Sequence, residues 1–411
     1  MPLNIIYIHQ HFSTRGGCAG TRSYEFGRLL VGKFHHRVNM LCGRNRKSNF
    51  AQPSERAVDR IDVDGIDVHV CNVSYAQQAG FCGRVKAFLA FALQAAREGV
   101  KLKGADLVFA TSTPITVAVP GLLISWLKRI PLVFEVRDIW PESAVATGVL
   151  KNPLLIRFLT WFERFVYRKA TRIVTVSERM KARMVECANI PPNKITVVPL
   201  GADPDLFGQG SRVNFRKRYK LEKDFVAIFT GAHGLANGLD LVVDAAAYLP
   251  PGVKIVLIGD GGKKAELKEK AHSMGLDNIL FLDPLPKDEL AEVLAEVDCG
   301  LMILQPLDIF STVLPNKFFD YLASGLPIVV NFPGGVADIV EGKQVGIFTR
   351  NSTPQSLAEA ITRFAEDREF CQRCGSNGRE LSKEYSREKL IVDFERCLAD
   401  AVSQYDWGWR R

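Results

Sequence analysis

The sequence predicts an α/β protein with two doubly wound parallel sheets, and three observations support this fold class. Short apolar runs typical of strands alternate with amphipathic helical stretches along most of the 411 residues. A glycine-containing loop follows the first strand of each half, with Gly16 and Gly17 in the first half and Gly231 in the second. A polar stretch at residues 205–223 separates the two runs of alternation. A chain of this length can bury more than one core.

The domain boundaries follow from this division. We expect a first domain at residues 1–203 and a second domain at residues 204–384. Residues 385–411 read as a helical tail that ends in two tryptophans and two arginines, and we expect this tail to pack back on the first domain.

The elements of the first domain follow from its hydrophobic pattern. Its strands are apolar runs rich in valine and isoleucine, as expected where both faces of a sheet are covered. They are predicted at residues 3–9, 38–42, 66–70, 106–111, 131–136 and 173–177. Its helices carry apolar residues three and four positions apart. They are predicted at residues 21–32, 85–103, 119–128 and 154–169. The G-x-G-x-x-G spacing of a dinucleotide fingerprint is absent.

The second domain repeats the same order of elements. Its strands are predicted at residues 225–230, 254–259, 279–282, 299–303 and 328–330. Its helices are predicted at residues 239–248, 263–273 and 287–295. In a doubly wound domain, ligand-binding loops lie at the carboxyl ends of the strands. The two halves are therefore expected to face a central cleft lined by these loops.

The stretch between residues 310 and 331 predicts a loop, a short helix and a buried strand. Pro315 suits the first turn of a helix, where a missing N–H costs nothing, and Gly325 ends that helix. A helix that opens from a loop presents free N–H groups and partial positive charge, to which Lys317 adds a full charge. With Asp320 one turn later, this stretch suits a sugar diphosphate. The alternative is a capped helix with an ion pair between Lys317 and Asp320.

The composition indicates an anionic partner and a reducing compartment. The formal charge is +8 and the pI is near 9.0, which favours nucleotides, phosphates, nucleic acid or anionic lipid. Nine scattered cysteines do not resemble a disulfide framework, so we expect a cytoplasmic protein. We expect no signal peptide, and no apolar run reaches the roughly 18 residues of a membrane span.

Two short motifs suggest metal binding, each with a simpler alternative. Cys371 and Cys374 form a C-x-x-C pair without a second pair, which chance spacing on a charged helix also explains. Asp203 and Asp205 form a D-x-D pattern, which here falls in an expected interdomain linker. We expect no metal at either place.

Three segments combine basic and apolar residues in a way that suits a membrane surface. They are the predicted helices at 85–103 and 154–169 and the segment 122–129. Each could lie on an anionic bilayer. The alternative for each is an apolar face buried in the domain and a basic face in water.

Nearly the whole chain resembles glycosyltransferase family 4, whose fold is GT-B. Seven landmarks in order carry the resemblance: Gly16-Gly17 with Arg22, Val136-Arg-Asp-Ile-Trp-Pro-Glu-Ser143, Val176-Ser-Glu178, Pro199-Leu-Gly-Ala-Asp203, Gly231-Ala-His-Gly234, Ile258-Gly-Asp-Gly261 and the segment from Leu314 to Gly325. The resemblance implies two Rossmann-like domains, an acceptor-binding one followed by a donor-binding one. The 138–142 and 315–317 landmarks resemble the branch that builds bacterial O-antigen, capsule and colanic-acid-type polysaccharides.

The resemblance implies a UDP-sugar donor, often N-acetylated, and a lipid-diphosphate-linked saccharide acceptor at the cytoplasmic face of the inner membrane. The implied donor-binding residues are Gly16, Gly17, Arg22, Gly231, His233, Asn237, Gly259, Asp260, Leu285, Thr312, Val313, Leu314, Asn316 and Lys317.

This sequence departs from the family pattern in the donor site. The arginine and lysine of the family's G-R-x-x-x-x-K-G loop fall on Ala232 and Asn237. The first acid of the E-x7-E motif falls on Thr312 and the second on Asp320. We expect Lys317, His233 and the amides around Val313 and Leu314 to supply the compensating charge.

The family is understood to retain anomeric configuration without metal or other cofactor. The carried-over catalytic residues are Asp138, Glu142 and Asp320. A clear carboxylate nucleophile for double displacement is absent, so front-face displacement is preferred. Asp138 or Glu142 would orient the acceptor hydroxyl, and the alternative is that both are turn acids. His9 and His11 are alternative polar groups at the end of the first strand.

Two rival functions remain open on the sequence. A nucleotide-sugar epimerase or phosphorylase shares the two-lobed architecture and would process the donor without an acceptor. A basic nucleic-acid-binding protein would explain the charge, but the basic residues are interleaved with acids and no recognition motif occurs.

Overall fold

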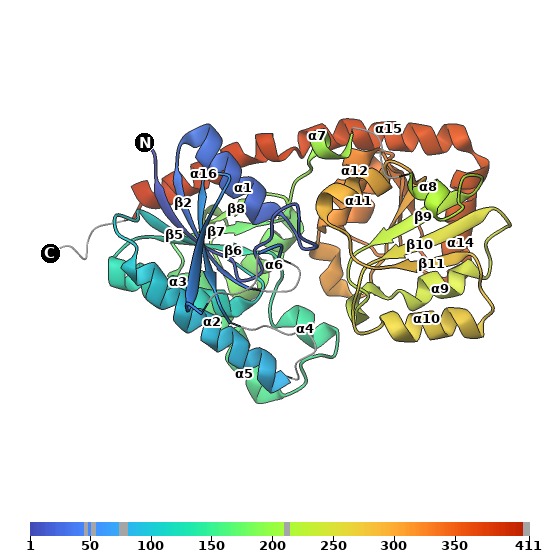
Figure 1. Cartoon of the computed structure of the whole chain (residues 1–411). Helices are drawn as coiled ribbons and strands as arrows, with labels where there is room; N and C mark the ends of the chain where they lie inside the picture. The colour runs from blue at the N-terminus through green and yellow to red at the C-terminus, as the bar shows by residue number, and fades with distance from the viewer. Residues whose placement is uncertain (45–47, 51–54, 74–80, 209–213, 406–411) are drawn as a thin grey trace. The chain divides into compact units, whose positions relative to one another are not determined.

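A computed structural model describes residues 1–44, 48–50, 55–73, 81–208 and 214–405. Contacts divide the chain into two compact units (Figure 1). The first unit comprises residues 1–199 and the chain from residue 387 onward, and the second comprises Leu200–Ser386. Each unit is built on one twisted sheet with helices on its faces, so the α/β class with two largely parallel sheets is confirmed.

The sheet of the first unit has eight strands in the order β3-β4-β2-β1-β5-β6-β7-β8. The strands are β1 (Asn4–Ile8), β2 (Arg37–Gly43), β3 (Val58–Val63), β4 (Ile66–Cys71), β5 (Leu107–Thr111), β6 (Leu132–Val136), β7 (Arg172–Thr175) and β8 (Ile195–Val197). Neighbours are parallel except β3 and β4, which form an antiparallel edge. The sequence analysis did not include β3, whose side chains are largely exposed and give little apolar signal.

Seven α-helices accompany this sheet within the described residues. They are α1 (Arg22–Phe34), α2 (Phe81–Lys101), α3 (Ala118–Lys128), α4 (Glu142–Ala146), α5 (Pro153–Lys169), α6 (Glu178–Ala188) and α16 (Arg387–Ser403). Asn152 caps α5 by accepting hydrogen bonds from the amides of Leu154 and Leu155, and Pro153 opens the helix. None of the helices in the described part of the chain is long and apolar enough to cross a membrane.

The last helix of the chain is part of the first unit. α16 contacts α1 and strands β5, β6 and β7 (Figure 1). Phe394 of α16 packs edge-on against Phe26 and Phe109, with ring centroids 4.9 Å apart in both pairs. This aromatic cluster covers one face of the sheet with residues that are more than 280 positions apart in the sequence. The two tryptophans at the end of the tail, Trp407 and Trp409, lie outside the described residues.

The sheet of the second unit has six parallel strands in the order β11-β10-β9-β12-β13-β14. The strands are β9 (Phe225–Thr230), β10 (Val253–Ile258), β11 (Ile279–Leu282), β12 (Cys299–Met302), β13 (Ile328–Val330) and β14 (Gly346–Phe348). The helices are α7 (Pro204–Phe207), α8 (Phe215–Arg218), α9 (Asp240–Ala246), α10 (Lys264–Ser273), α11 (Lys287–Leu294), α12 (Asn316–Ser324), α13 (Gly335–Gly342), α14 (Pro354–Glu366) and α15 (Arg368–Glu384). All six side chains of β9 are buried, which places this strand in the middle of the core.

The predicted short helix is confirmed as α12. It starts after Pro315, and Gly325 ends it in the left-handed conformation with φ 72°. Tyr321 ties the helix to the central strand, because its hydroxyl accepts a hydrogen bond of 2.9 Å from the amide of Thr230. A Cβ at Gly300 of β12 would lie 2.5 Å from the Tyr321 ring, so glycine is required for this approach. These contacts fix the N-terminus of α12 relative to the end of β9.

The residues of the two motifs considered for metal binding have other surroundings in the structure. Cys371 and Cys374 lie on one face of α15, in the core of the second unit, and burial raises the pKa of both thiols. Asp203 lies next to α7 and forms an ion pair with Lys287. Among the described residues, histidine, cysteine and acidic side chains do not gather in a group that could hold a metal ion.

Candidate active site

Two glycine loops meet backbone to backbone at the carboxyl ends of β9 and β10. Gly231 has φ 134° and Gly259 has φ 156°, conformations that side chains rarely adopt. A Cβ at Gly259 would lie 1.8 Å from the carbonyl oxygen of Gly231, and a Cβ at Gly261 would lie 2.4 Å from that of His233. The glycines are therefore required for the packing of the loops. Gly231 and Gly259 are two of the donor-binding residues that the resemblance implies.

Backbone hydrogen bonds hold the two loops together. The amide of His233 donates to the carbonyl of Asp260 at 3.0 Å, and the amide of Lys263 donates to the carbonyl of His233 at 2.9 Å. The Asp260 side chain is exposed and accepts from the amide of Gly261 at 2.8 Å. Lys264, which sequence reasoning missed, donates to the carbonyl of Gly259 at 2.8 Å and to Asp283 at 2.6 Å. The loop conformation is thus set before any ligand binds.

His233 is completely buried between two aromatic rings. Its ring centroid lies 6.3 Å from that of Phe229 and 6.4 Å from that of Phe281. Within the described residues, neither ring nitrogen has a hydrogen-bond partner. Burial, reinforced by the charge of Lys264, lowers the pKa of His233 to about 4. His233 is therefore neutral at pH 7, and the expectation that it adds positive charge is revised: it can donate an N–H.

Lys317 projects from the first turn of α12 onto the end of the central strand. Its ammonium nitrogen lies 3.5 Å from the centroid of the Phe229 ring, and a Cβ at Gly231 would lie 3.5 Å from the same nitrogen. The nitrogen is buried and has no hydrogen-bond partner in the part of the chain that the structure describes. Burial lowers the pKa of Lys317 to about 7. A buried ammonium without a counter-ion is costly, so an anion at this place would be stabilised by it.

Some polar groups next to Lys317 already have hydrogen-bond partners within the protein, and others do not. The Asn316 side-chain oxygen is buried and, in the described residues, unpartnered. The hydroxyl of Thr312 donates to the carbonyl of Ile309 at 2.7 Å, and the amide of Val313 donates to the carbonyl of Phe310 at 3.3 Å. Leu314 is buried. The amide of Val313, predicted to hold phosphate, is therefore engaged in the turn that precedes α12.

Asp320 has a different environment from the one predicted for a catalytic group. Its carboxylate lies 2.8 Å from the ammonium of Lys287, which lies 3.7 Å from Asp203. All three side chains are buried, and the Lys287 ammonium also lies 5.1 Å from the Phe207 ring centroid. This buried cluster joins α12 to α11 and α7. The ion pairs with Lys287 compensate the buried charges of Asp320 and Asp203, and the catalytic role that the resemblance implies for Asp320 stays a prediction.

Two further predicted donor residues lie on the surface of the second unit. Asn237 ends a short 3-10 turn (Leu235–Asn237), and its amide donates to the carbonyl of Gly234 at 3.2 Å. Leu285 lines a hollow of about 330 Å³ together with Phe281 and with Phe215 and Tyr219 near α8. The hollow is also lined by the charged residues Arg218, Asp283 and Glu289. Its aromatic walls suit a flat ring such as a nucleobase.

Arg22, which the resemblance implies for donor binding, has its hydrogen-bond partners inside the first unit. It is wholly buried and pairs with Glu135 of β6 at 2.8 Å. Its other nitrogens donate to the carbonyls of Val198 and Pro199. The guanidinium therefore links α1 to the end of β6 and to the chain that follows β8. Gly16 and Gly17 lie in a turn before α1, where a Cβ at Gly16 would lie 2.9 Å from the Asn49 side chain.

Asp138 and Glu142 have different environments although they are close in sequence. Asp138 accepts a hydrogen bond from Ser143 at 3.0 Å, and burial raises its pKa to about 6. Glu142 forms an ion pair with Arg183 of α6. A carboxyl group that titrates near neutral pH can accept a proton from a hydroxyl, so Asp138 suits a general base. Glu142 is occupied by its cation.

His9 and Arg137 both lie at the carboxyl ends of strands in the first sheet, His9 after β1 and Arg137 after β6. His9 is buried after β1, and burial together with the charge of Arg137 lowers its pKa. Arg137 follows β6 directly, and only His9 of the two was considered from the sequence. An arginine inside the landmark 136–143 could have been noted as a candidate, because it stands at the carboxyl end of a predicted strand.

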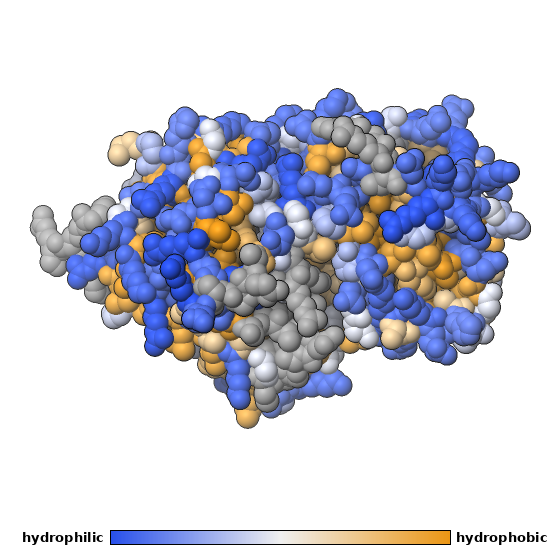
Figure 2. Space-filling model, viewed as in Figure 1, coloured by the Kyte–Doolittle hydropathy of each residue, from blue (hydrophilic) through white to orange (hydrophobic). Residues whose placement is uncertain are grey.

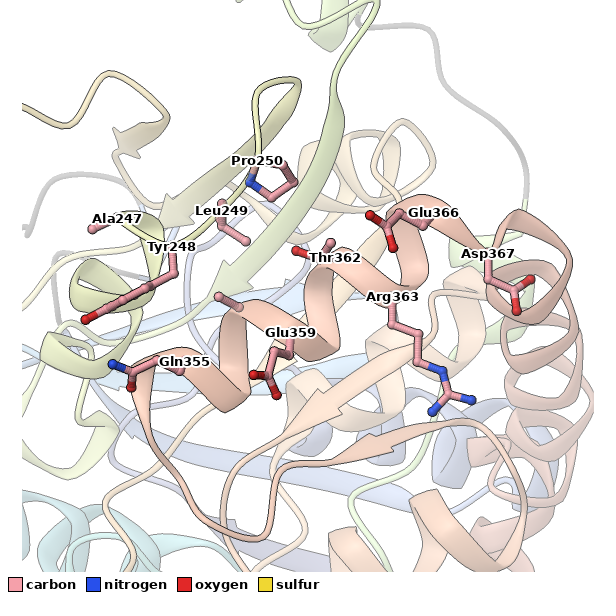
Figure 3. Close-up of a pocket in the computed structure, with 11 residues that line it drawn as sticks. Ala247, Tyr248, Leu249, Pro250, Gln355, Glu359, Thr362, Arg363, Glu366 and Asp367 are labelled. Atoms are coloured by element: carbon pink, nitrogen blue, oxygen red, sulfur yellow. The ribbon is translucent and has the colours of Figure 1, made fainter.

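A hollow of about 770 Å³ is formed by α14 and the chain after α9 (Figure 3). Tyr248 and Gln355 lie at one end of it and Arg363 and Asp367 at the other. It contains none of the predicted site residues, and its lining lacks the glycine loops that phosphate binding uses.

Sequence comparison identifies both halves of the chain. Residues 17–201 match the family described as glycosyl transferase 4-like domain, and residues 211–381 match glycosyl transferases group 1. The probable glycosyltransferase WbjE of Pseudomonas aeruginosa is 24% identical over 73% of this chain and 76% of its own length. The D-inositol 3-phosphate glycosyltransferase of Mycolicibacterium smegmatis is 26% identical over 67% of this chain and 65% of its own length. A GDP-mannose-dependent phosphatidylinositol monomannoside mannosyltransferase of Mycobacterium tuberculosis is 23% identical, over 66% and 69%.

Solved structures share the fold along the whole chain. Anabaena HepE in complex with UDP and glucose superimposes with a TM-score of 0.69 at 19% identity, over 98% of this chain and 100% of that one. Sucrose-phosphate synthase from Thermosynechococcus elongatus gives a TM-score of 0.73 at 14% identity, over 97% and 99%. WaaG, a glycosyltransferase involved in lipopolysaccharide biosynthesis, gives 0.66 at 16% identity, over 97% and 100%. The chain therefore belongs to the GT-B glycosyltransferases that join a family 4-like domain to a group 1 domain.

Proposed function

We propose that this glycosyltransferase moves a sugar from a UDP-sugar to a lipid-diphosphate-linked saccharide in bacterial surface polysaccharide biosynthesis. The observation that carries the donor half is Lys317, whose buried ammonium lacks an anionic partner among the described residues and lies beside Gly231. A nucleoside diphosphate would place its charge between this ammonium and the first turn of α12. HepE, which shares the fold, has been solved with UDP and with UDP-glucose.

The acceptor half of the proposal rests on relatives and on the first unit. The printed name of WaaG includes lipopolysaccharide biosynthesis, and the mycobacterial mannosyltransferase acts on a phosphatidylinositol mannoside. The first name refers to the synthesis of a lipid-containing polysaccharide, and the second refers to a glycolipid. We take the donor sugar to be of the N-acetylated hexosamine type, on the resemblance to the O-antigen and capsule branch. The enzyme would work at the cytoplasmic face of the inner membrane.

The chemistry that these groups support is charge stabilisation without a metal. As the bond between the sugar and the diphosphate breaks, negative charge grows on the departing phosphate oxygen, and the Lys317 ammonium and helix amides stabilise it. The acceptor hydroxyl forms the new bond on the face that the diphosphate leaves, which retains the anomeric configuration. Its proton passes to the departing phosphate or to Asp138.

A transfer assay tests the proposal. The protein is incubated with a panel of UDP-sugars, with and without lipid-diphosphate-linked saccharides, and products are analysed by mass spectrometry and NMR. We expect a glycosylated lipid only when both substrates are present, with the α-anomer formed from an α-linked donor. A changed sugar nucleotide in the absence of acceptor would instead identify an epimerase. Transfer only from GDP-sugars would contradict the UDP assignment.

A further inference from the structure

We propose that the outer faces of α2, α3 and α5 form one docking surface for an anionic lipid bilayer. The inference deepens the proposed function, because a lipid-linked acceptor resides in such a bilayer, but it uses none of the nucleotide-binding residues. α3 contacts both α2 and α5, so the three helices form a continuous layer on the first unit (Figure 1). We call their outward side the α2–α3–α5 face.

Large apolar side chains are exposed all along this face. On α5, Leu154 is 78% exposed and Trp161 is 56% exposed, with Phe158 between them. On α3, Trp126 is 73% exposed beside Leu123 and Leu127. Apolar surface of this extent costs free energy in water and marks an interaction site. Figure 2 shows orange apolar spheres interspersed with blue ones in the region that these helices occupy in Figure 1.

The exposed apolar residues of α2 extend the same face. Leu89 and Leu93 are exposed one helical turn apart. On α5 the aromatic rings are stacked along the helix, with the Trp161 and Phe165 centroids 5.6 Å apart. Tryptophan and phenylalanine next to aliphatic residues are the composition of interfacial membrane-binding helices.

The charge of the face is complementary to anionic lipid. The sequences of α2, α3 and α5 contain two acidic residues, Glu98 and Glu163, and both are buried. Glu98 is paired with Arg60, and Glu163 accepts a hydrogen bond from Tyr167, with burial raising the pKa of Glu163 to about 8. The exposed charged side chains of these helices are therefore lysines and arginines. They include Lys86, Arg97, Arg157, Arg164, Arg168 and Lys169.

Both features are needed for the assignment to a bilayer. Lysine and arginine around an apolar centre attract lipid phosphates, while the aromatic and aliphatic side chains enter the region between headgroups and acyl chains. Two copies of the chain that docked through this face would bring their lysines and arginines together, so the same charge fits a second copy less well.

The face also adjoins the residues assigned to the acceptor. A cavity of about 330 Å³ lies between α4, α5 and α6, and its lining includes Glu142 of α4 and Ile156 and Tyr167 of α5. α5 thus contributes one side to this cavity and another to the α2–α3–α5 face. An enzyme resting on this face would hold the Asp138–Glu142 segment close to the bilayer, where the saccharide of a lipid-linked acceptor projects.

Vesicle flotation with the full-length protein tests the inference. Phosphatidylcholine vesicles with and without phosphatidylglycerol are the probes. We expect binding to the mixed vesicles, weakening with salt, together with a blue shift of tryptophan fluorescence. Trp126→Ala combined with Trp161→Ala should reduce the apparent partition coefficient by about tenfold or more. Arg157→Glu combined with Arg168→Glu should do the same, since each basic residue near an anionic surface contributes.

Matched variants on the second unit serve as controls. Tyr248→Ala removes an aromatic side chain that is 55% exposed, and Lys268→Glu combined with Lys343→Glu reverses two exposed charges. These should float as the wild type does, and circular dichroism should show all variants folded. Equal loss in the controls, flotation independent of phosphatidylglycerol, or a dimer that only the tryptophan variants lose would overturn the inference. UDP binding, measured in parallel, reports separately on the proposed function.

Discussion

The ammonium nitrogen of Lys317 lies 3.5 Å from the centre of the Phe229 ring, near the end of strand β9 and next to Gly231. The aromatic face supplies only part of the stabilisation that a buried cation requires. Among the described residues, no hydrogen-bond acceptor supplies the remaining stabilisation of the ammonium. The protein therefore keeps a cation at the end of its central strand at a cost in stability, as expected where a charged ligand binds.

Removing this cation should stabilise the free protein. We expect Lys317→Met, which keeps the apolar stem, to raise the free energy of unfolding by about 1 kcal/mol or more, because a buried charge without a partner is removed. Urea denaturation followed by circular dichroism measures this. The control is Lys268→Met, an exposed lysine on α10, which should change stability by less than about 0.5 kcal/mol. A loss of stability in Lys317→Met would mean that the ammonium has a partner.

The pH dependence of nucleotide binding should show the titration of Lys317. Its pKa in the free protein is about 7, below the ordinary value of 10.5, and a bound diphosphate favours the charged form. The affinity for UDP should therefore fall as the pH rises from about 7 to 9, with proton uptake on binding. Calorimetry in buffers of different ionisation enthalpy detects that uptake. Lys317→Arg, which stays charged, should bind UDP with little dependence on pH in this window; a slope as steep as that of the wild type would exclude Lys317 as the titrating group.

The same lowered pKa has a consequence for stability. Between about pH 7 and 10.5 the unfolded chain holds a proton on Lys317 that the folded chain has released. Stability therefore rises with pH in this range, and the destabilising effect of the lysine is complete below it and lost above it. The difference in unfolding free energy between Lys317→Met and the wild type should accordingly shrink as the pH is raised.

Two glycines of one loop should respond differently to the same substitution. Gly259→Ala would put a Cβ 1.8 Å from the carbonyl oxygen of Gly231 at a φ of 156°, whereas a Cβ at Gly262 has nothing within 4 Å. We expect Gly259→Ala to cost about 2 kcal/mol or more of stability and to weaken UDP binding, because the two loops must separate. Gly262→Ala should be nearly neutral in both. Denaturation and calorimetry compare them, and equal effects would show that the loop contact is not what sets the site.

Substitutions of Asp138 and of Glu142 should have different effects on kcat. We expect Asp138→Asn to lower kcat about 100-fold or more with unchanged UDP affinity, because the amide cannot accept the acceptor's proton. In the wild type, kcat/KM should fall below about pH 6 as Asp138 becomes protonated. Glu142→Gln breaks the ion pair with Arg183 and should act mainly on stability. Equal kcat losses in the two variants, or an unchanged pH profile in Asp138→Asn, would remove the distinction.

The buried cluster around Lys287 should behave as a unit. Lys287→Met leaves two carboxylates, Asp320 and Asp203, without their shared cation. We expect a loss of about 3 kcal/mol. Adding Asp320→Asn should recover part of that loss, and a double-mutant cycle measures the coupling. Additive effects of the two substitutions would show that Asp320 does not depend on Lys287.

Local signals in the sequence were sufficient for much of the fold. Pro315 and Gly325 define the ends of α12 because each acts through its own backbone geometry. The six buried residues of β9 form a continuous apolar run, which is readable without knowledge of the neighbouring strands. The antiparallel strand β3 was not predicted, because an exposed edge strand lacks such an apolar run.

The charged partners could not be predicted in the same way. Arg22 and Glu135 are separated by 113 positions and meet only when the sheet forms. Asp320 has Lys317 three residues before it, yet it pairs with Lys287 of another helix. The sequence predicts which residues carry charge and at which strand ends they lie. Which of them remains available to a ligand depends on tertiary contacts. Arg22 has partners inside the first unit, whereas the Lys317 ammonium has no hydrogen-bond partner among the described residues.

The most direct measurement of the central claim compares UDP with uridine by isothermal titration calorimetry. The two ligands share the nucleoside and differ in the diphosphate that Lys317 is proposed to bind. We expect Lys317→Met to weaken UDP binding at pH 7 by about tenfold or more and to leave uridine binding unchanged, since a charge-assisted contact is lost only with the diphosphate. Unchanged affinity for UDP, or equal weakening for both ligands, would contradict the assignment of Lys317 to the donor diphosphate.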